Sequence, residues 1–304
     1  MTSGIEPAGA GLTLSPGRRS AIRRRITTWA PRARRGHSLP WRSSNDPWHV
    51  FVSEIMLQQT GAARVAQRFD DMIAQFPTPG ACAAAGQAAV VRAWVGLGYV
   101  RRAVALHNSA EIIVTRHAGA VPRSFDALVA LPGVGPYTAR AVLAFAHGVD
   151  VAAVDINVVR VLTRAVTGRT LVPNELQILA DGLIPPGQAG PWNQALFDLG
   201  ATVCTASAPD CPHCPLATLC AWRQAGSDAP DPHRKPAVQK RFEGSDRQGR
   251  GRLVAAAARG AIVSGRLASV MGWPDDARRA RRVAADLVAE GVLCRDAVGA
   301  YHLA

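Results

Sequence analysis

Along residues 20–220, apolar side chains recur at the three- and four-residue spacing of helices that bury one face. Most of these apolar residues are Ala, Leu and Val, and Pro and Gly separate one short run from the next. This part of the chain shows neither a sustained alternation of apolar and polar residues nor a repeat of fixed period. The pattern therefore predicts a mainly α-helical core.

The composition changes after Cys220, where residues 223–249 are polar, contain Pro and carry few apolar side chains, which predicts a linker. Further along, Val283, Leu287 and Val288 form an apolar stripe on a helix predicted over residues 274–290. The closing sequence VLCRDAVGAYHLA predicts a β-hairpin. Helices followed by a terminal hairpin indicate a small winged-helix-like module over residues 250–304, of a kind that contacts nucleic acid or protein.

The formal net charge of +13 indicates a polyanionic partner, most simply nucleic acid, with an anionic membrane surface as the competing interpretation. Eight arginines lie between Arg18 and Arg35, and no carboxylate occurs between Glu6 and Asp46. We expect this arginine-rich stretch to lie near phosphates.

The 304 residues include 48% hydrophobic residues, which suits a globular protein with more than one domain. The longest apolar stretch, residues 141–159, is interrupted by His147, Asp150 and Asp155, so we expect no membrane span. The N-terminus lacks the basic and apolar regions of a signal peptide. We therefore expect a cytoplasmic protein, associated with the nucleoid when it is bound to DNA.

Four of the six cysteines are crowded into one short segment, with the spacing C-x6-C-x2-C-x5-C. They are Cys204, Cys211, Cys214 and Cys220. Four thiolates in one loop can hold a [4Fe-4S] cluster or a zinc ion, and structural zinc more often shows two C-x2-C pairs. The spacing favours an iron-sulfur cluster, and we interpret Cys82 and Cys294 as ordinary small apolar residues.

A helix–turn–helix pattern occupies residues 125–148, and the connection between its two apolar helices reads LPGVG. Gly133 and Gly135 permit a sharp turn whose backbone N–H groups face outward at a helix N-terminus, which is a ready site for a phosphate oxygen. We interpret this segment as a helix-hairpin-helix DNA clamp.

Two carboxylates stand next to apolar segments. Glu54 lies in the stretch SEIMLQQT, which we predict to continue the apolar helix that begins near Trp48, and burying its charge there is costly unless the charge is paired or protonated. Asp155 follows the apolar residues 151–154 and begins a new helix, so its side chain has either a capping or a catalytic role. Asn157 and Arg160 are equally compatible with a solvent-facing position.

With these motifs in view, the chain resembles the helix-hairpin-helix DNA glycosylases that carry an iron-sulfur cluster, and within them the adenine DNA glycosylases. The resemblance covers roughly residues 25–220. It rests on LPWR (39–42), SEIMLQQT (53–60), GLGY (96–99), LPGVGPYTA (131–139), VDINVVRV (154–161), NQALFDLGA (193–201) and the four cysteines, in this order.

The resemblance implies a mainly α fold with a two-lobed helix-hairpin-helix glycosylase core, a [4Fe-4S] loop and the small C-terminal module. The expected divisions are a flexible arm (1–20), a six-helix lobe with the hairpin (39–150), an iron-sulfur lobe (21–38 and 151–222), the linker (223–249) and the winged-helix-like module (250–304). The Nudix-like domain that family members usually carry is not evident in the sequence after Cys220.

Relatives that act on oxidised pyrimidines use a lysine two residues after the second hairpin glycine to form a Schiff base and nick the strand. This chain has Tyr137 there, and its only lysines are Lys235 and Lys240. Because residues 1–234 offer no lysine amine as a nucleophile, we expect water to displace the base.

The resemblance also assigns roles to the site residues. Glu54, with a pKa raised by apolar surroundings, is expected to protonate the departing adenine at N7, and Asp155 to stabilise the oxocarbenium-like sugar. Asn157 and the helix N-terminus are expected to keep Asp155 ionised. The opposite base and the wedge are assigned to Gln59, Thr60, Leu97 and Tyr99, and part of the adenine pocket to Arg42 and Gln194.

The expected partner is double-stranded DNA with adenine opposite 8-oxoguanine or guanine, bound by a monomer, and Arg101 and Arg102 are expected to contact its phosphates. The loop TASAPD between the first two cysteines lacks basic residues, so we expect a structural cluster. Two alternatives stay open. One is a thymine or uracil mismatch glycosylase, and the other is a non-catalytic DNA-binding protein on the same scaffold.

Overall fold

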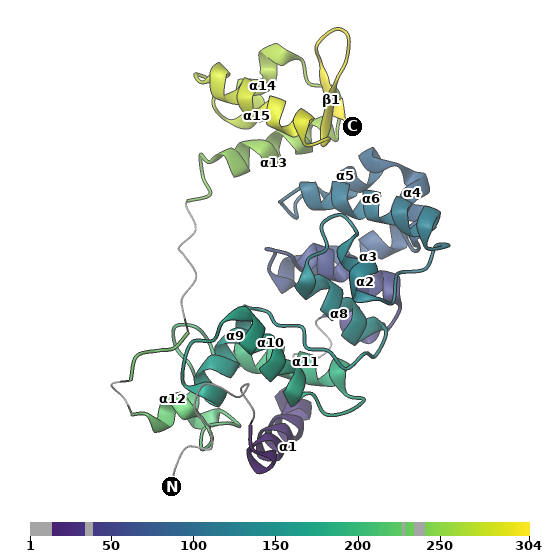
Figure 1. The fold of residues 1–304 in the computed structure, drawn as a ribbon. Helices are drawn as coiled ribbons and strands as arrows, with labels where there is room; N and C mark the ends of the chain where they lie inside the picture. The colour runs from purple at the N-terminus through teal and green to yellow at the C-terminus, as the bar shows by residue number, and fades with distance from the viewer. Residues whose placement is uncertain (1–13, 34–38, 227–228, 234–240) are drawn as a thin grey trace. The chain divides into compact units, whose positions relative to one another are not determined.

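The computed structural model describes residues 14–33, 39–226, 229–233 and 241–304, and every structural statement below concerns these residues (Figure 1). Part of the predicted arm, Arg34 and Arg35, and both lysines lie outside them. The chain divides into two compact units: unit 1 comprises Met1–Ser38 and Pro136–Ala237, and unit 2 comprises Leu39–Gly135 and Val238–Ala304. Helices dominate both units, which confirms the mainly α fold. None of the helices in the described part is long and apolar enough to cross a bilayer.

Unit 1 packs its helices around a core of Leu, Val, Ile and Ala side chains. Its elements are α1 (Pro16–Ala33), α8 (Pro136–Ala146), α9 (Ile156–Val161), the π-helical η2 (Leu162–Thr167), α10 (Pro173–Leu183), α11 (Ala189–Thr202), the 3₁₀ turn η3 (Cys211–His213) and α12 (Ala221–Gln224). Helix α11 contacts α1, α8 and α9, so it occupies the middle of the unit.

Helix α1 begins inside the segment that the sequence indicated as an arm. The Ser15 hydroxyl accepts a hydrogen bond from the Arg18 backbone N–H at 3.4 Å, and Pro16 occupies the first helical position. Ile22 and Ile26, one turn apart, are 2% and 0% exposed. Burial of this apolar stripe holds the helix on unit 1.

Three of the α1 arginines bond backbone carbonyls of unit 1, which corrects the expectation of phosphate contacts for these three residues, whereas Arg24 of the same helix is exposed. Arg18 donates to the Val166 and Leu219 carbonyls at 3.2 and 3.1 Å. Arg23 donates to the carbonyls of residues 182–184, and Arg25 to that of Pro215. The loops that end beside α1 leave carbonyls without helical partners, and these guanidinium groups satisfy them.

Unit 2 combines the segment before the glycine turn with the C-terminal residues. Its elements are η1 (Pro40–Ser43), α2 (Pro47–Leu57), α3 (Ala62–Gln75), α4 (Pro79–Ala85), α5 (Gln87–Trp94), α6 (Arg101–Arg116), α7 (Phe125–Val129), α13 (Asp246–Ala257), η4 (Ser264–Arg266), α14 (Leu267–Met271), α15 (Ala277–Ala289), β1 (Leu293–Arg295) and β2 (Tyr301–Leu303).

Helix α2 ends at Leu57, so SEIMLQQT is not one continuous helix as the sequence suggested. Asp46 caps its start by accepting from Trp48 N–H at 2.8 Å. At its end, Gln59 adopts a left-handed φ of 54°, and the Thr60 N–H bonds back to the Leu57 carbonyl at 3.2 Å. This turn therefore places Gln59 and Thr60 outside the helix.

The LPGVG turn joins α7 to α8 along the chain, as predicted. Gly133 has a φ of 75°, and a Cβ there would lie 2.9 Å from that of Ala105, so a side chain is excluded both by backbone strain and by contact. Gly135 does not adopt a left-handed φ among the described glycines. The backbone conformation of the turn therefore requires glycine at position 133 but not at position 135.

The C-terminal residues form three helices and a hairpin. Ser245 caps α13, which thus begins within the segment predicted as a linker. Strands β1 and β2 pair antiparallel with Cys294 opposite His302, and an isolated bridge joins Ile262 to Tyr301. Cys294 is exposed on this hairpin, whereas Cys82 is a buried core residue. Burial raises the pKa of the Cys82 thiol to about 12, so that thiol stays protonated and inert.

Candidate active site and cysteine pocket

Glu54 lies on α2 in unit 2, and its side chain is 5% exposed. Its helix neighbours Ser53, Ile55 and Met56 are at most 1% exposed. The sequence expectation that this carboxyl is buried is therefore confirmed. A charged form of this group is disfavoured here unless polar partners compensate for the lost hydration.

Asp155 is the N-cap of α9 in unit 1. Its Oδ1 accepts from the Asn157 and Val158 backbone N–H groups, both at 2.8 Å, and its Oδ2 accepts from Asn157 Nδ2 at 2.7 Å. Burial raises the pKa of Asp155 above its ordinary value, and these hydrogen bonds together with the nearby charge of Arg160 oppose that rise. The stabilising partners expected from the sequence are present, but desolvation outweighs them.

Arg160 forms a hydrogen bond with Asn157, the residue that binds the Asp155 carboxylate. It is 4% exposed, so its alternative as a solvent-facing residue is excluded. Its Nη2 donates to Asn157 Oδ1 at 2.7 Å and to the Gly200 carbonyl at 2.5 Å, while its Nε donates to the Cys204 carbonyl at 2.5 Å. One guanidinium thus connects the capping carboxylate, through Asn157, with the first residue of the cysteine loop.

The motif NQALFDLGA positions the same site from α11. Asn193 is fully buried and its amide bonds the Val151 carbonyl and the Ala153 N–H, which fixes the chain leading to Asp155. Gly200 faces Asn157 so closely that a Cβ would lie 2.5 Å from the Asn157 Cβ. Gln194, next to Asn193, is partly exposed. Two residues of this motif therefore have structural roles. Asn193 holds the segment before Asp155 in place, and Gly200 allows α11 to pack closely against Asn157.

Tyr137 stands near the start of α8, also in unit 1. Its ring lies 6.4 Å from that of Phe197, which in turn lies 6.0 Å from Phe145. The ring is partly exposed. Arg42, assigned to the adenine pocket, lies in η1 of unit 2 and is likewise partly exposed.

Arg102 organises the segments assigned to the opposite base. It is 8% exposed and donates to the carbonyls of Ile55 and Met56 at 3.0 and 2.7 Å. It also bonds the Leu97 and Gly98 carbonyls and Thr60 Oγ1. Burial lowers the pKa of Arg102 to about 10. This arrangement corrects the expectation of a phosphate contact by Arg102, whereas the side chain of the neighbouring Arg101 is 74% exposed.

The GLGY loop presents Tyr99 and hides Leu97. Leu97 is 1% exposed, so here it packs in the core instead of projecting as a wedge. Tyr99 is 39% exposed, has a left-handed φ of 46°, and its hydroxyl lies 3.4 Å from Arg247 Nη1. Thr60 Oγ1 donates to the Leu97 carbonyl at 3.1 Å, and Gln59 is exposed. Gln59, Thr60 and Tyr99 thus lie on two segments joined by Arg102.

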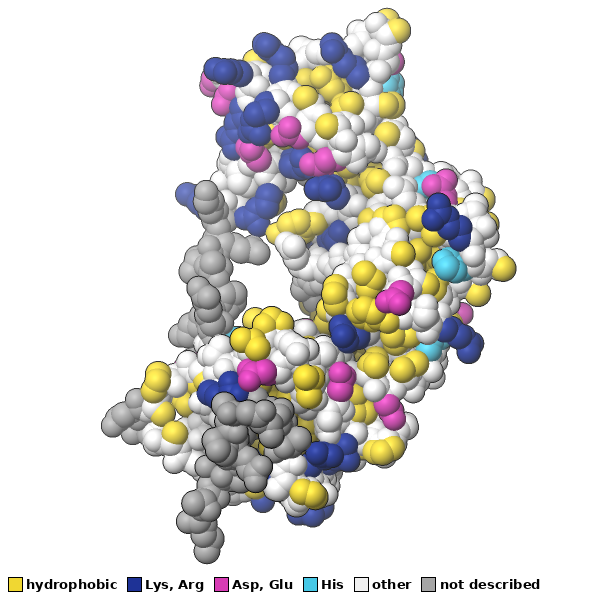
Figure 2. All heavy atoms as spheres, in the orientation of Figure 1, with side chains coloured by type: hydrophobic (Ala, Val, Ile, Leu, Met, Phe, Trp, Pro, Cys, Tyr) yellow, Lys and Arg dark blue, Asp and Glu magenta, His cyan; other side chains and the backbone are white. Residues whose placement is uncertain are grey.

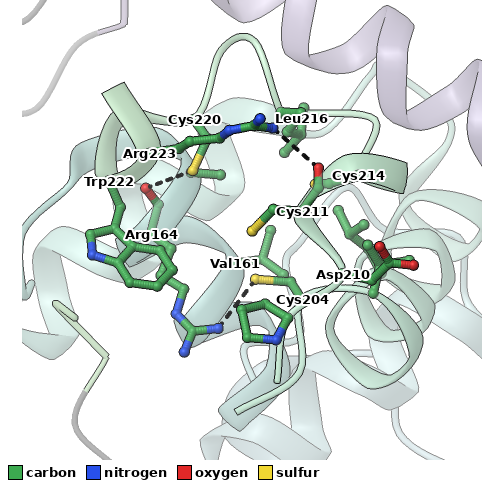
Figure 3. Close-up of a pocket in the computed structure, with 15 residues that line it drawn as sticks. Val161, Arg164, Cys204, Asp210, Cys211, Cys214, Leu216, Cys220, Trp222 and Arg223 are labelled. Atoms are coloured by element: carbon green, nitrogen blue, oxygen red, sulfur yellow. Dashed lines mark hydrogen bonds between the residues drawn. The ribbon is translucent and has the colours of Figure 1, made fainter. Parts of the chain in front are cut away.

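The four cysteines of the short segment line a single pocket, together with Arg164, Trp222 and apolar side chains of unit 1 (Figure 3). None is in a disulfide. Burial raises the pKa of Cys204, Cys214 and Cys220, that of Cys214 to about 11, so the free thiols are protonated at neutral pH. A metal centre would be needed to hold them as thiolates.

Arg164 forms one wall of this pocket, and it was not singled out from the sequence. It lies in η2, whose π-helical winding is typical of functional sites, and it is 2% exposed. Its Nη1 donates to Cys204 Sγ at 3.7 Å, its guanidinium stacks on Trp222 at 4.9 Å, and Asp231 pairs with it at 2.5 Å. The sequence did offer one signal for Arg164, because this charged residue lies four positions after Arg160 within an otherwise apolar helical segment.

The side chains of this pocket are of the kind that ligate a [4Fe-4S] cluster. Among the described residues, no group of three or more His, Cys, Asp or Glu converges on a position for a single metal ion. A [4Fe-4S] cluster takes one thiolate at each iron, so its ligands stand apart around the cluster. Four cysteines around one shared pocket fit that requirement, with Arg164 supplying positive charge beside the sulfurs.

The fold and these motifs define a class, and comparison with known proteins gives the same one. The family model described as HhH-GPD superfamily base excision DNA repair protein matches residues 52–181. A solved thermostable thymine-DNA glycosylase superposes with a TM-score of 0.65 at 29% identity, over 69% of this chain and 98% of that one. A solved endonuclease III, trapped as a covalent intermediate with DNA, superposes with a TM-score of 0.60 at 25% identity, over 70% of this chain and 99% of that one.

Within this class the full-length relatives are more specific. The adenine DNA glycosylase of Mycolicibacterium smegmatis is 42% identical over 92% of this chain and 94% of the relative. The human adenine DNA glycosylase is 38% identical over 67% of this chain, which spans 40% of the human protein. The chain belongs to the HhH-GPD superfamily of base excision DNA repair proteins and, within it, to the adenine DNA glycosylase family.

Proposed function

We propose that this protein is a monofunctional DNA glycosylase that removes adenine mispaired with 8-oxoguanine or guanine, by hydrolysis of the N-glycosidic bond. One observation carries the proposal. The Asp155 carboxylate is fixed by three hydrogen bonds at the partly exposed start of α9, where an anion is available to a developing sugar cation. Relatives named adenine DNA glycosylase support the choice of base.

The proposed chemistry divides between the two carboxyl groups. After the adenine is extruded from the duplex, Glu54 donates a proton to N7, and the C1′–N9 bond breaks with its electron pair going to the base. Asp155 stabilises the resulting oxocarbenium-like sugar electrostatically. Water adds at C1′ and loses a proton, which leaves an abasic site. Tyr137, where lyase relatives have a lysine, offers no amine, so the backbone stays intact.

The remaining assignments rest on the same scaffold. Gln59, Thr60 and Tyr99 contact the base opposite the adenine, Arg42 and Gln194 line the adenine pocket, and Gly133 and Gly135 meet a DNA phosphate. Leu97, which is buried, contributes by packing in the core from the GLGY loop and not as a wedge in the DNA. The enzyme works as a monomer in the cytoplasm, where thiols stay reduced.

A [4Fe-4S] cluster on Cys204, Cys211, Cys214 and Cys220 completes the proposal. The shared pocket and the basic wall at Arg164 support it. Held by these four thiolates, such a cluster would connect the segment that follows α11 with Cys220, the N-cap of α12. Anaerobically prepared protein should show broad absorption at ~400 nm if these thiolates hold a cluster. Zinc without this absorption would contradict the assignment, and Cys214→Ser should weaken the band while Cys294→Ser leaves it intact.

A second candidate is removal of mispaired thymine or uracil, which the solved thymine-DNA glycosylase favours by its superposition. Its 29% identity over 69% of this chain is lower than the 42% over 92% shared with the adenine-named relative. The third possibility is a non-catalytic DNA-binding protein. Such a protein would not require a buried carboxyl at Glu54 or a carboxylate fixed by three hydrogen bonds at Asp155.

A base-release assay separates these candidates. Duplexes containing A opposite 8-oxoguanine, A opposite G, or T opposite G are incubated with the protein, and strand breaks are scored with and without hot alkali. We expect breaks at adenine only, dependent on alkali and abolished in Glu54→Gln. The surface variant Glu111→Gln is the matched control and should keep full activity. Breaks at thymine would support the second candidate, and binding without any product would support the third.

A further inference from the structure

The C-terminal residues contain a face that the glycosylase site does not use. From Asp246 onward the order of elements is α13, the bridge at Ile262, α14, α15 and the β1–β2 hairpin. Helices α14 and α15 are joined by residues 272–276, with Gly272 at a left-handed φ of 82°. This is a helix–turn–helix followed by a wing, in which the second helix is the one that docks on a nucleic acid.

Helix α15 has one buried and one exposed face. Ala280, Val283, Ala284 and Leu287 are at most 1% exposed and pack into the module. Arg278, Arg281, Arg282 and Ala285 are exposed and follow one another at the spacing of the opposite face. The small side chain of Ala285 leaves room for a partner to approach the helix closely.

The C-terminal segment of residues 246–304 has more positive than negative side chains. Residues 246–304 contain ten arginines, no lysine and six carboxylates, which gives +4 by subtraction. Five of the six carboxylates have partners: Asp246 binds Arg279 and Arg282, Asp276 caps α15, Asp286 binds Arg282, Glu290 binds Arg250, and Asp296 binds His302.

Four arginines of the module, in contrast, have no hydrogen bond or ion pair from their guanidinium groups to the residues that the structure describes. They are Arg259, Arg266, Arg278 and Arg281. Asp275 is the one carboxylate near α15 without such a partner, so the uncompensated charge there is positive. Figure 2 shows basic side chains gathered over the C-terminal module.

We propose that the outer face of α15 binds the phosphate backbone of duplex DNA, as a contact region separate from the site of base removal. Two exposed guanidinium groups three residues apart, beside the positive end of the helix, match neighbouring phosphates. A lipid surface would require large apolar side chains between the arginines, and this face offers alanines instead. The contact adds affinity without sequence choice.

The test uses the full chain on undamaged duplex DNA, so its result does not depend on which base the enzyme removes. We compare Arg278→Gln/Arg281→Gln with wild type and measure Kd against salt concentration. The slope of log K on log salt should fall by about 1.8, because each lost phosphate contact contributes about 0.9, and Kd at about 0.1 M salt should rise on the order of 10- to 100-fold. Circular dichroism and the melting temperature should stay unchanged.

The double variant Arg259→Gln/Arg266→Gln removes the same charge from the same module and is the matched control. An unchanged slope in Arg278→Gln/Arg281→Gln would overturn the proposal. An equal loss in the control would also overturn it, because net charge and not the α15 face would then be responsible. Loss of binding to phosphatidylglycerol vesicles with duplex binding intact would assign the face to a membrane instead.

Discussion

At the scale of single residues, the Asp155 carboxylate is held between two opposing effects. Burial raises its pKa, and the hydrogen bonds from Asn157 and Val158 lower it. Because the proposed mechanism needs the ionised form, the reaction should slow as pH falls through this pKa. The acid limb should therefore lie above the ordinary Asp value of 3.8.

Asn157→Ala should move that limb to higher pH, because it removes the hydrogen bond that stabilises the ionised Oδ2. The measurement is the single-turnover rate of adenine release as a function of pH. Asn174→Ala, at an exposed position on α10, is the control and should leave the profile in place. An acid limb that stays fixed in Asn157→Ala would contradict the role given to this amide.

Gly200 tests the same site by shape. In Gly200→Ala the new Cβ would meet Asn157 at 2.5 Å, so Asn157 and the carboxylate it binds must shift. Misplacement of this kind should lower the single-turnover rate by about 100-fold while the helix survives. In Gly182→Ala, on α10, the Cβ would meet nothing within 4 Å. That control should keep its rate and gain up to about 1 kcal/mol in stability, and equal rates in both variants would refute the argument.

At the scale of elements, one buried guanidinium joins the end of α2 to the GLGY loop. Arg102→Met removes the guanidinium donor from the carbonyls of Ile55 and Met56, so the free energy of unfolding should fall by about 3 kcal/mol or more. Urea denaturation measures this loss. Arg101→Met, at a side chain 74% exposed, should change stability by less than about 0.5 kcal/mol. Equal stabilities would show that water replaces the lost donor.

At the scale of the whole molecule, unit 1 is assembled from two distant segments. Ile26 of α1 is fully buried against residues of the second segment, so Ile26→Ala should lower the free energy of unfolding by about 2–5 kcal/mol. Ile178→Ala, on α10 of the same unit and 55% exposed, is the control and should cost less than about 0.5 kcal/mol. Similar losses in both would mean that α1 does not contribute to this core.

The family and most of the candidate site could be predicted from the sequence, because their signals are local. The helical periodicity, the LPGVG turn, the cap at Asp155, the burial of Glu54 and the grouping of four cysteines each depend on neighbouring residues. Family motifs in a fixed order then indicated adenine DNA glycosylases, and the relatives confirm that assignment.

Only the tertiary structure decided what the arginines do. Composition gave a charge of +13 and suggested phosphate contacts, yet Arg18, Arg102 and Arg160 point into the protein and satisfy backbone carbonyls. A guanidinium reaches carbonyls or phosphates equally well, and the choice depends on which chain ends fold beside it. The sequence by itself therefore determined the family and its local motifs, whereas the division of charge between core and surface required the packed chain.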